Sequence, residues 1–369
     1  MRSVRTLILS GGGGRGAFHA GVYRYLSEIA WQPDIVVGTS IGAVNGAAIA
    51  QGISAADLER IWLALRERDI QGLPPGMGPL ARWVANRAWK SALGVTLPQV
   101  PPAESASPHP ASFWPPLPIL PGWLGEKLIG RWMNLLDTAP LRHTLKEKLH
   151  LDEARIAASP TTLLMAATDV QTGQRVLFSN REVRNRWTGE LRSDVVTGIT
   201  LTRILASCSI PLVYPWTRDE QTGRVYWDGA VVANTPLGAA LDVVRDVPPE
   251  IPMEVVVVLM TPWWEHRDGE GSLQRGLPQS FDEAITWTLD WALLASFRER
   301  LRQIRFFNQL AEQEIASGAA ERRHRLVQVR IAAPQEFFPA ARILDYDEYS
   351  ATLIRLGHQA AAQVMRNDG

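Results

Sequence analysis

The sequence has a single cysteine, Cys208, among its 369 residues. An internal disulfide is therefore excluded, and a reducing compartment fits this usage. Neither sign of charge is in excess, because 38 Lys and Arg residues balance 38 Asp and Glu residues. The balance argues against a protein that binds nucleic acid through bulk positive charge, so we expect no nucleic-acid partner.

Long hydrophobic runs are also missing. The apolar run at residues 7–9 ends at glycines and is too short for the apolar segment of a signal peptide. The longest apolar stretch, residues 255–260, is far below the roughly 20 residues that a membrane-spanning helix needs. We therefore expect a cytoplasmic protein, peripheral to a membrane at most.

Apolar runs alternate with amphipathic segments along most of the chain. This periodicity predicts strands over residues 4–9, 34–37, 161–167, 175–178, 255–260 and 326–331. It predicts helices over residues 17–29, 41–51, 55–68, 280–316 and 348–365. The strand–helix alternation favours an α/β fold with a mostly parallel sheet and helices on its faces.

Residues 73–122 differ from the rest, since they hold 12 of the 25 prolines. This insertion also carries Trp83, Trp89 and Trp114, in a protein with 14 tryptophans. Tryptophan beside basic residues is typical of segments that lie on a membrane, so one hypothesis is a lid or membrane-docking element. The other hypothesis is a packed excursion whose tryptophans are buried on the domain.

The pentapeptide 38–42, Gly-Thr-Ser-Ile-Gly, lies between a predicted strand and a predicted helix. That context is the one required by a nucleophile elbow, in which a sharp turn exposes the hydroxyl of Ser40. Gly38 and Gly42 leave room for the neighbouring backbone. The alternative is an ordinary turn with an N-capping serine or threonine.

A glycine loop, residues 11–16, follows the first predicted strand. Its consecutive N–H groups could surround an anion, such as the oxyanion formed during acyl transfer. The loop lacks the lysine of a phosphate-binding P-loop, and no acidic residue ends the next strand as a dinucleotide site requires. A tight turn without a ligand is the remaining alternative.

A serine nucleophile needs a base, which is most often histidine. Of the seven histidines, only His266 lies in a loop after a late predicted strand, so no histidine is favoured. Asp228 follows a short aromatic strand and precedes Gly229, a pair that on its own indicates a turn. We find no cluster with metal-ligand spacing, and expect no metal and no cofactor.

Three motifs taken together carry a resemblance: the glycine loop 11–16, the elbow 38–42 and Asp228-Gly229-Ala230, in this order. Segments 167–169, 172–173 and 206–211 support it. The chain resembles the patatin-like phospholipase family over about residues 4–260. The resemblance implies one three-layer α/β/α sandwich domain. The insertion at 73–122, for which a lid is one hypothesis, departs from the family pattern, and residues 280–369 are predicted as a C-terminal helical extension with one strand.

The resemblance also implies a serine acyl-ester hydrolase acting on lipids. Ser40 would be the nucleophile and Asp228 its base, in a dyad without histidine. The N–H groups of Gly12, Gly13 and Gly14 would form the oxyanion hole, with Arg15 positioning or neutralising the anion. The implied partner is a lipid or other acyl-ester substrate. Contact of the tryptophan-containing insertion with a membrane surface is a separate hypothesis, which rests on the residues of that insertion.

Two other classes of function remain as alternatives. A non-catalytic lipid-binding protein could keep the same fold, but it would need neither Ser40 nor Asp228. A nucleotide-binding protein could use the glycine loop, but the missing P-loop lysine disfavours it.

Overall fold

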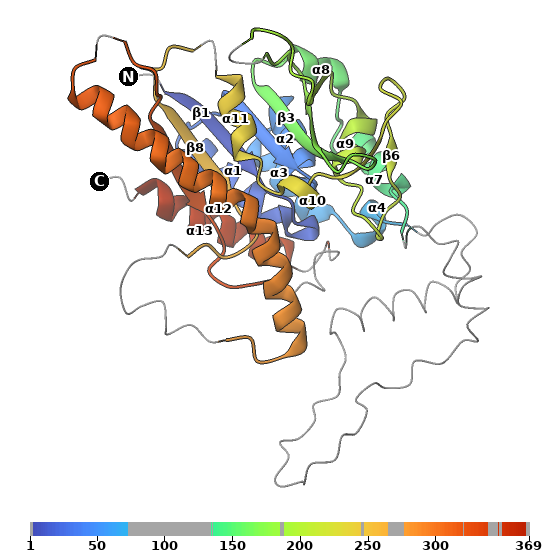
Figure 1. The fold of residues 1–369 in the computed structure, drawn as a ribbon. Coiled ribbons are helices and arrows are strands. Elements are labelled where there is room, and N and C mark those ends of the chain that lie inside the picture. Colours follow the sequence, from blue (N-terminus) through green and yellow to red (C-terminus); the bar gives the residue numbers. More distant parts are fainter. Residues whose placement is uncertain are drawn as a thin grey trace, which may run out of the picture.

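The computed structural model describes residues 3–72, 134, 136–184, 188–244, 247–264, 277–319, 321–338, 346 and 349–366. The proline-rich insertion predicted at 73–122 lies outside these residues, and so do His109 and His266. Figure 1 shows a central sheet with helices on both of its faces.

The described strands form one nine-stranded sheet, in which β5-β4-β3-β2-β1-β8-β9 is the main order and β7 pairs with β3 and β6. Five strand pairs are parallel and three, all involving β3, β6 or β7, are antiparallel. The predicted α/β class with a mostly parallel sheet is therefore confirmed. The strands are β1 (Val4–Leu9), β2 (Ile35–Thr39), β3 (Thr162–Asp169), β4 (Arg175–Ser179), β5 (Val195–Thr197), β6 (Thr217–Arg218), β7 (Val225–Asp228), β8 (Met253–Val258) and β9 (Val327–Ala332).

Alternate residues of the central strands enter two separate cores, because successive side chains point to opposite faces of a sheet. Leu7 and Leu9 pack in one core, with α1, α2, α3 and α13, whereas Ile8 packs in the other, with α11 and α12. In Figure 1, α12 crosses the front of the sheet as the long orange helix. These helices are α1 (Ala17–Glu28), α2 (Ile41–Ala50), α3 (Ala55–Ala64), α11 (Leu237–Val243), α12 (Phe281–Ala316) and α13 (Ser350–Arg366).

The remaining described helices are short. The 3₁₀ helix η1 (Gly13–Gly16) leads into α1, and α9 (Leu201–Ser207) and α10 (Ala230–Ala233) flank the hairpin of β6 and β7. The others are α4 (Glu67–Ile70), α7 (Ala139–Glu147) and α8 (Glu153–Ala158). The short pieces bring turns, and therefore functional side chains, to the edge of the sheet where the parallel strands end.

Helices α1 and α13 meet backbone against backbone. A Cβ atom added at Gly21 would lie 1.9 Å from the carbonyl oxygen of Ile354, and one at Gly357 would lie 2.1 Å from that of Phe18. Only glycine permits such an approach. The helix that follows the glycine loop is therefore held by a helix from the other end of the described chain.

Candidate active site

Ser40 occupies a sharp turn between β2 and α2. Its φ of 55° and ψ of −127° lie outside the regions that side-chain-bearing residues normally adopt, which is the strain expected of a nucleophile elbow. Neighbouring glycines make the turn feasible, since a Cβ at Gly38 would lie 2.3 Å from the carbonyl oxygen of Gly42. A Cβ at Gly42 would lie 2.2 Å from the carbonyl oxygen of Leu9.

Asp228 ends β7, and its register opposite Ala167 places it beside the C-terminal end of β3. The carboxylate is buried, and its Oδ1 accepts a hydrogen bond from the N–H of Ala230 at 2.8 Å. Its Oδ2 accepts none from any residue that the structure describes. A Cβ at Gly229 would lie 2.3 Å from the carbonyl oxygen of Ala166, so the turn after Asp228 also requires glycine.

Burial raises the pKa of Asp228 from its ordinary value to about 7. Hydrogen bonding from the Ser40 side chain and from the N–H of Ala230 opposes this rise. The structure thus brings the two predicted residues together, in an environment that makes the carboxylate a stronger base than an exposed aspartate.

The glycine loop passes directly beside Ser40, since a Cβ added at Gly11 would lie 3.2 Å from the Ser40 Cβ. The N–H of Gly11 already donates to Oδ1 of Asn234 at 3.0 Å. The N–H groups of the next three residues, Gly12 to Gly14, donate to no other described residue. Those three N–H groups therefore lie beside Ser40 without a described acceptor.

Two asparagines fix the ends of this loop. Asn234, from the turn after α10, holds Gly11 as just described. Asn45, on α2, donates to the carbonyl oxygen of Gly16 at 3.0 Å and accepts from the indole N–H of Trp62 at 3.0 Å. The sequence motifs did not single out either asparagine.

The resemblance implies that Arg15 positions or neutralises the anion, and the structure places its side chain against the glycine loop, Met260 and Asp290. Its guanidinium is buried and donates to the carbonyl oxygens of Gly12 at 3.3 Å and Met260 at 3.1 Å. It also forms an ion pair with Asp290 of α12, at 3.5 Å. A neighbouring carboxylate of opposite charge leaves Arg15 little net charge to offer an oxyanion.

No described histidine forms a hydrogen bond with Ser40 or Asp228. His19, in α1, is buried with Nδ1 hydrogen-bonded to the side chain of Asn45, and burial lowers its pKa to about 3. His324 and His358 are each paired with a glutamate. Within the described residues, the ionisable side chain beside Ser40 is therefore a carboxylate and not an imidazole.

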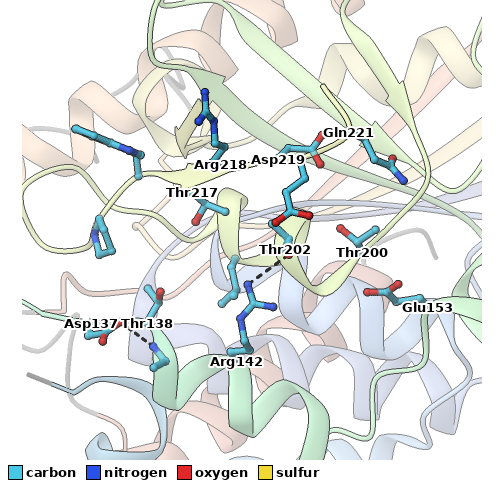
Figure 2. Close-up of a pocket in the computed structure, with 15 residues that line it drawn as sticks. Asp137, Thr138, Arg142, Glu153, Thr200, Thr202, Thr217, Arg218, Asp219 and Gln221 are labelled. Atoms are coloured by element: carbon cyan, nitrogen blue, oxygen red, sulfur yellow. Dashed lines mark hydrogen bonds between the residues drawn. The ribbon is translucent and has the colours of Figure 1, made fainter. Parts of the chain in front are cut away.

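A polar pocket of about 530 Å³ lies elsewhere, between α7, α9 and the hairpin of β6 and β7 (Figure 2). Its lining mixes charges of both signs, and neither Ser40 nor Asp228 contributes to it. In Figure 2, Arg142 reaches toward Thr202, to which it donates a hydrogen bond of 3.3 Å. This pocket is therefore separate from the site that the motifs define.

The geometry above is that of an α/β protein with a strained serine, a buried carboxylate and a glycine loop at one edge of its sheet. A model of the patatin-like phospholipase family matches residues 7–241. The chain therefore belongs to the patatin-like phospholipase family, whose members are in general lipid acyl hydrolases.

Individual proteins match this chain over a short segment or at low sequence identity. The chain is 37% identical over 94 residues to lysophospholipase nte1 of Emericella nidulans, a match that covers 26% of this chain and 5% of that protein. Among solved structures, VipD from Legionella pneumophila aligns with 99% of this chain and 67% of its own, at 13% identity and a TM-score of 0.40. The type III effector ExoU of Pseudomonas aeruginosa aligns with 100% of this chain and 53% of its own, at 13% identity and a TM-score of 0.35.

Proposed function

We propose that this protein is a serine hydrolase that cleaves acyl esters of lipids, with Ser40 as nucleophile and Asp228 as its base. The observation that carries the proposal is the buried Asp228 carboxylate, which has one oxygen free of described partners beside a serine on a strained elbow. A non-catalytic lipid-binding protein would have no reason to retain this arrangement, because it strains the backbone and buries a charge.

In the first half of the reaction, ionised Asp228 accepts the hydroxyl proton of Ser40 as the serine oxygen attacks the ester carbonyl. The N–H groups of Gly12, Gly13 and Gly14 donate to the negatively charged oxygen of the tetrahedral intermediate. When the intermediate collapses, the C–O bond to the leaving alcohol breaks and Asp228 returns the proton to that alcohol. In the second half, Asp228 takes a proton from water as the water oxygen attacks the acyl-serine. When this second intermediate collapses, the C–O bond to Ser40 breaks, Asp228 returns the proton to the Ser40 oxygen, and the fatty acid is released.

Contact with a lipid surface is part of the proposal. Four aromatic rings from the segment after β8, from α12 and from the segment after β9 contact one another: Trp264, Trp287, Trp291 and Phe337. Trp263, next to Trp264 in the sequence, contacts Phe297 instead, and Arg298 lies over both Trp263 and Trp291. The glycine loop touches the segment after β8 through Met260. Tryptophan with a basic residue suits the boundary between water and lipid. No described helix has both the length and the apolarity to cross a bilayer.

We place the protein in the cytoplasm, at a membrane surface.

The test of the dyad is hydrolysis of a short-chain p-nitrophenyl ester and labelling by a fluorophosphonate. We expect turnover and labelling at Ser40 in the wild type, and loss of both in Ser40→Ala. Asp228→Asn should fold and lose turnover. Asp169→Asn is the matched control, since Asp169 is also a buried carboxylate at a strand end but pairs with Arg224 and turn N–H groups. If the wild type neither turns over nor labels, even with lipid vesicles present, the hydrolase proposal fails.

Membrane contact has its own test, flotation with vesicles of mixed neutral and anionic phospholipid. Trp264→Ala and Trp287→Ala should bind less than the wild type. Trp216→Ala is the control, because Trp216 is 42% exposed but lines the separate polar pocket. Equal loss in all three variants, or in none, would exclude the ring cluster as the contact surface.

A further inference from the structure

The glycine loop has no side chain of its own to hold it from residue 11 to residue 14. Gly13 has a φ of 57°, a conformation that costs glycine nothing but gives the loop no rigidity of its own. The described contacts that restrain the loop at its centre come from Arg15, whose N–H and Nε both donate to the carbonyl oxygen of Gly12. The position of the proposed oxyanion donors therefore depends on the position of Arg15.

Arg15 is positioned by groups outside the loop. One is the carbonyl oxygen of Met260, just after β8, and the other is the Asp290 carboxylate of α12. Both side chains of the ion pair are almost fully buried, with 3% exposed for Arg15 and 4% for Asp290. A pair held in this way interacts strongly, because little water screens it.

Asp290 lies outside residues 7–241, the part of the chain that the family model matches. One turn further along α12, Leu294 is buried in the core between the helix and the sheet, and Phe297 follows it there. The backbone of Asp290 is thus anchored by α12 packing on the sheet. Burial raises the pKa of its carboxyl, and Arg15 opposes this rise.

We propose that Asp290 is a positioning residue for the oxyanion loop: it holds the Arg15 guanidinium against the Gly12 carbonyl and so aligns the N–H groups of the loop with Ser40. This inference rests on the proposed hydrolase function of Ser40. It assigns Arg15 a structural task, because its charge is already matched by that of Asp290.

The central experiment measures Asp290→Asn in two independent ways. With a short-chain ester, kcat should fall by about 10- to 100-fold, the cost of misplacing catalytic groups slightly, while KM should change little. In hydrogen–deuterium exchange, the backbone amides of residues 11–16 should exchange faster than in the wild type. The exchange measurement needs no substrate and no activity.

Leu294→Ala is the matched control. It lies on the same helix and creates a cavity that lowers the thermal midpoint without removing the ion pair. Its kcat and the exchange of residues 11–16 should remain as in the wild type at temperatures well below unfolding. If both variants lose kcat in proportion to their thermal midpoints, Asp290 only stabilises the fold and the proposal is overturned.

A double-mutant cycle tests whether Asp290 acts through Arg15. Asp290→Asn should cost little further kcat in the Arg15→Met background, because the interaction it removes is already gone. Equal costs in both backgrounds would overturn the proposal. If Asp290→Asn does not fold, the double variant Arg15→Met/Asp290→Leu replaces it, since that variant leaves no charge buried alone. Wild-type kcat and wild-type exchange in that variant would also overturn the proposal.

Failure of this inference can be told apart from failure of the proposed function. A wild type without turnover or labelling contradicts the hydrolase, while the exchange of residues 11–16 still decides whether Asp290 holds the loop. An active wild type together with unchanged kcat and exchange in Asp290→Asn contradicts the positioning role alone.

Discussion

The hydroxyl of Ser207 connects the backbone of Ser40 to strand β3. It accepts a hydrogen bond from the N–H of Ser40 at 3.0 Å and donates one to the carbonyl oxygen of Ala166 at 2.6 Å. The same carbonyl oxygen is the one that a side chain at position 229 would strike. Ser40, through the Ser207 hydroxyl, and Asp228, through the turn at Gly229, are therefore both positioned by the backbone of Ala166.

Ser207→Ala should reduce activity more than its effect on folding explains. The change leaves the buried N–H of Ser40 without an acceptor, which costs about 1–3 kcal/mol of unfolding free energy, and it releases the strained elbow. Ser209→Ala is the control, because that hydroxyl bonds Leu205 and Thr217 and not the elbow. Denaturant titration and kcat are measured for both. Equal activity in the two variants at equal stability would contradict a role for Ser207 in holding Ser40.

The rate should depend on the ionisation of Asp228. Because burial raises its pKa to about 7, kcat/KM should rise with pH and level off above that value. A profile already flat between about pH 5 and pH 8 would show that the carboxylate has the pKa of an ordinary exposed aspartate.

The free energy of unfolding should also depend on the ionisation of Asp228, but it should fall over the pH range in which kcat/KM rises. The folded state holds the Asp228 proton to higher pH than the unfolded state, so stability is lost as pH rises from about 4 to about 7. Asp228→Asn keeps the shape but not the charge and should remove this loss, with a gain on the order of 1–4 kcal/mol at pH 8. Denaturant titrations of wild type and variant at pH 5 and pH 8 check it. Parallel pH slopes in the two proteins would contradict it.

Gly42→Ala should abolish correct folding of the elbow. The added methyl group would lie 2.2 Å from the backbone oxygen of Leu9, which cannot move without breaking the pairing of β1. Gly46→Ala, one turn further along α2, is the control. Its nearest neighbour is the movable side chain of Val36 at 3.0 Å, and its helix position gains about 1 kcal/mol from alanine. Thermal midpoints compare the two, and an equal effect would contradict the steric argument.

The free energy of unfolding should depend strongly on both partners of the buried ion pair between Arg203 and Asp219. Arg203 donates to Asp219 through Nε and Nη2, and the side chains are 1% and 5% exposed. Asp219→Ala leaves the arginine charge buried and should cost about 3–5 kcal/mol. The double variant Asp219→Ala/Arg203→Met should recover much of this lost unfolding free energy, as measured by denaturant titration. A fully additive loss would contradict the coupling.

The sequence predicted most of the central architecture, because long runs with a clear period dominate it. The first strand was predicted with its observed bounds, Val4–Leu9, and the long helix α12 within one residue. The predicted helix 55–68 is wrong in one respect, since it ends at Ala64 and α4 begins anew at Glu67. The break occurs because Asp69 accepts a hydrogen bond from the N–H of Arg66 and starts a second helix.

Contacts between distant segments could not be predicted in the same way. The motifs singled out Ser40 and Asp228, which the structure places together, but their catalytic roles remain proposals. Asn234 and Asp290 carry no local signal, because an asparagine in a turn and an aspartate on a long polar helix are both common. Their roles depend on which loop the fold places next to them.

The position of β1 in the sheet has a consequence for the chain during its synthesis. β1 can pair with β2 soon after both are synthesised, but its other neighbour, β8, and the helix that packs on α1 by its Gly357 are synthesised much later. Until then, one edge of β1 exposes backbone groups that can pair with other chains. Until β8 is synthesised, the growing chain therefore has an unpaired strand edge beside the strand that leads into the glycine loop. A product terminated between β7 and β8 would contain Ser40 and Asp228 but would lack the strand that completes the sheet beside β1.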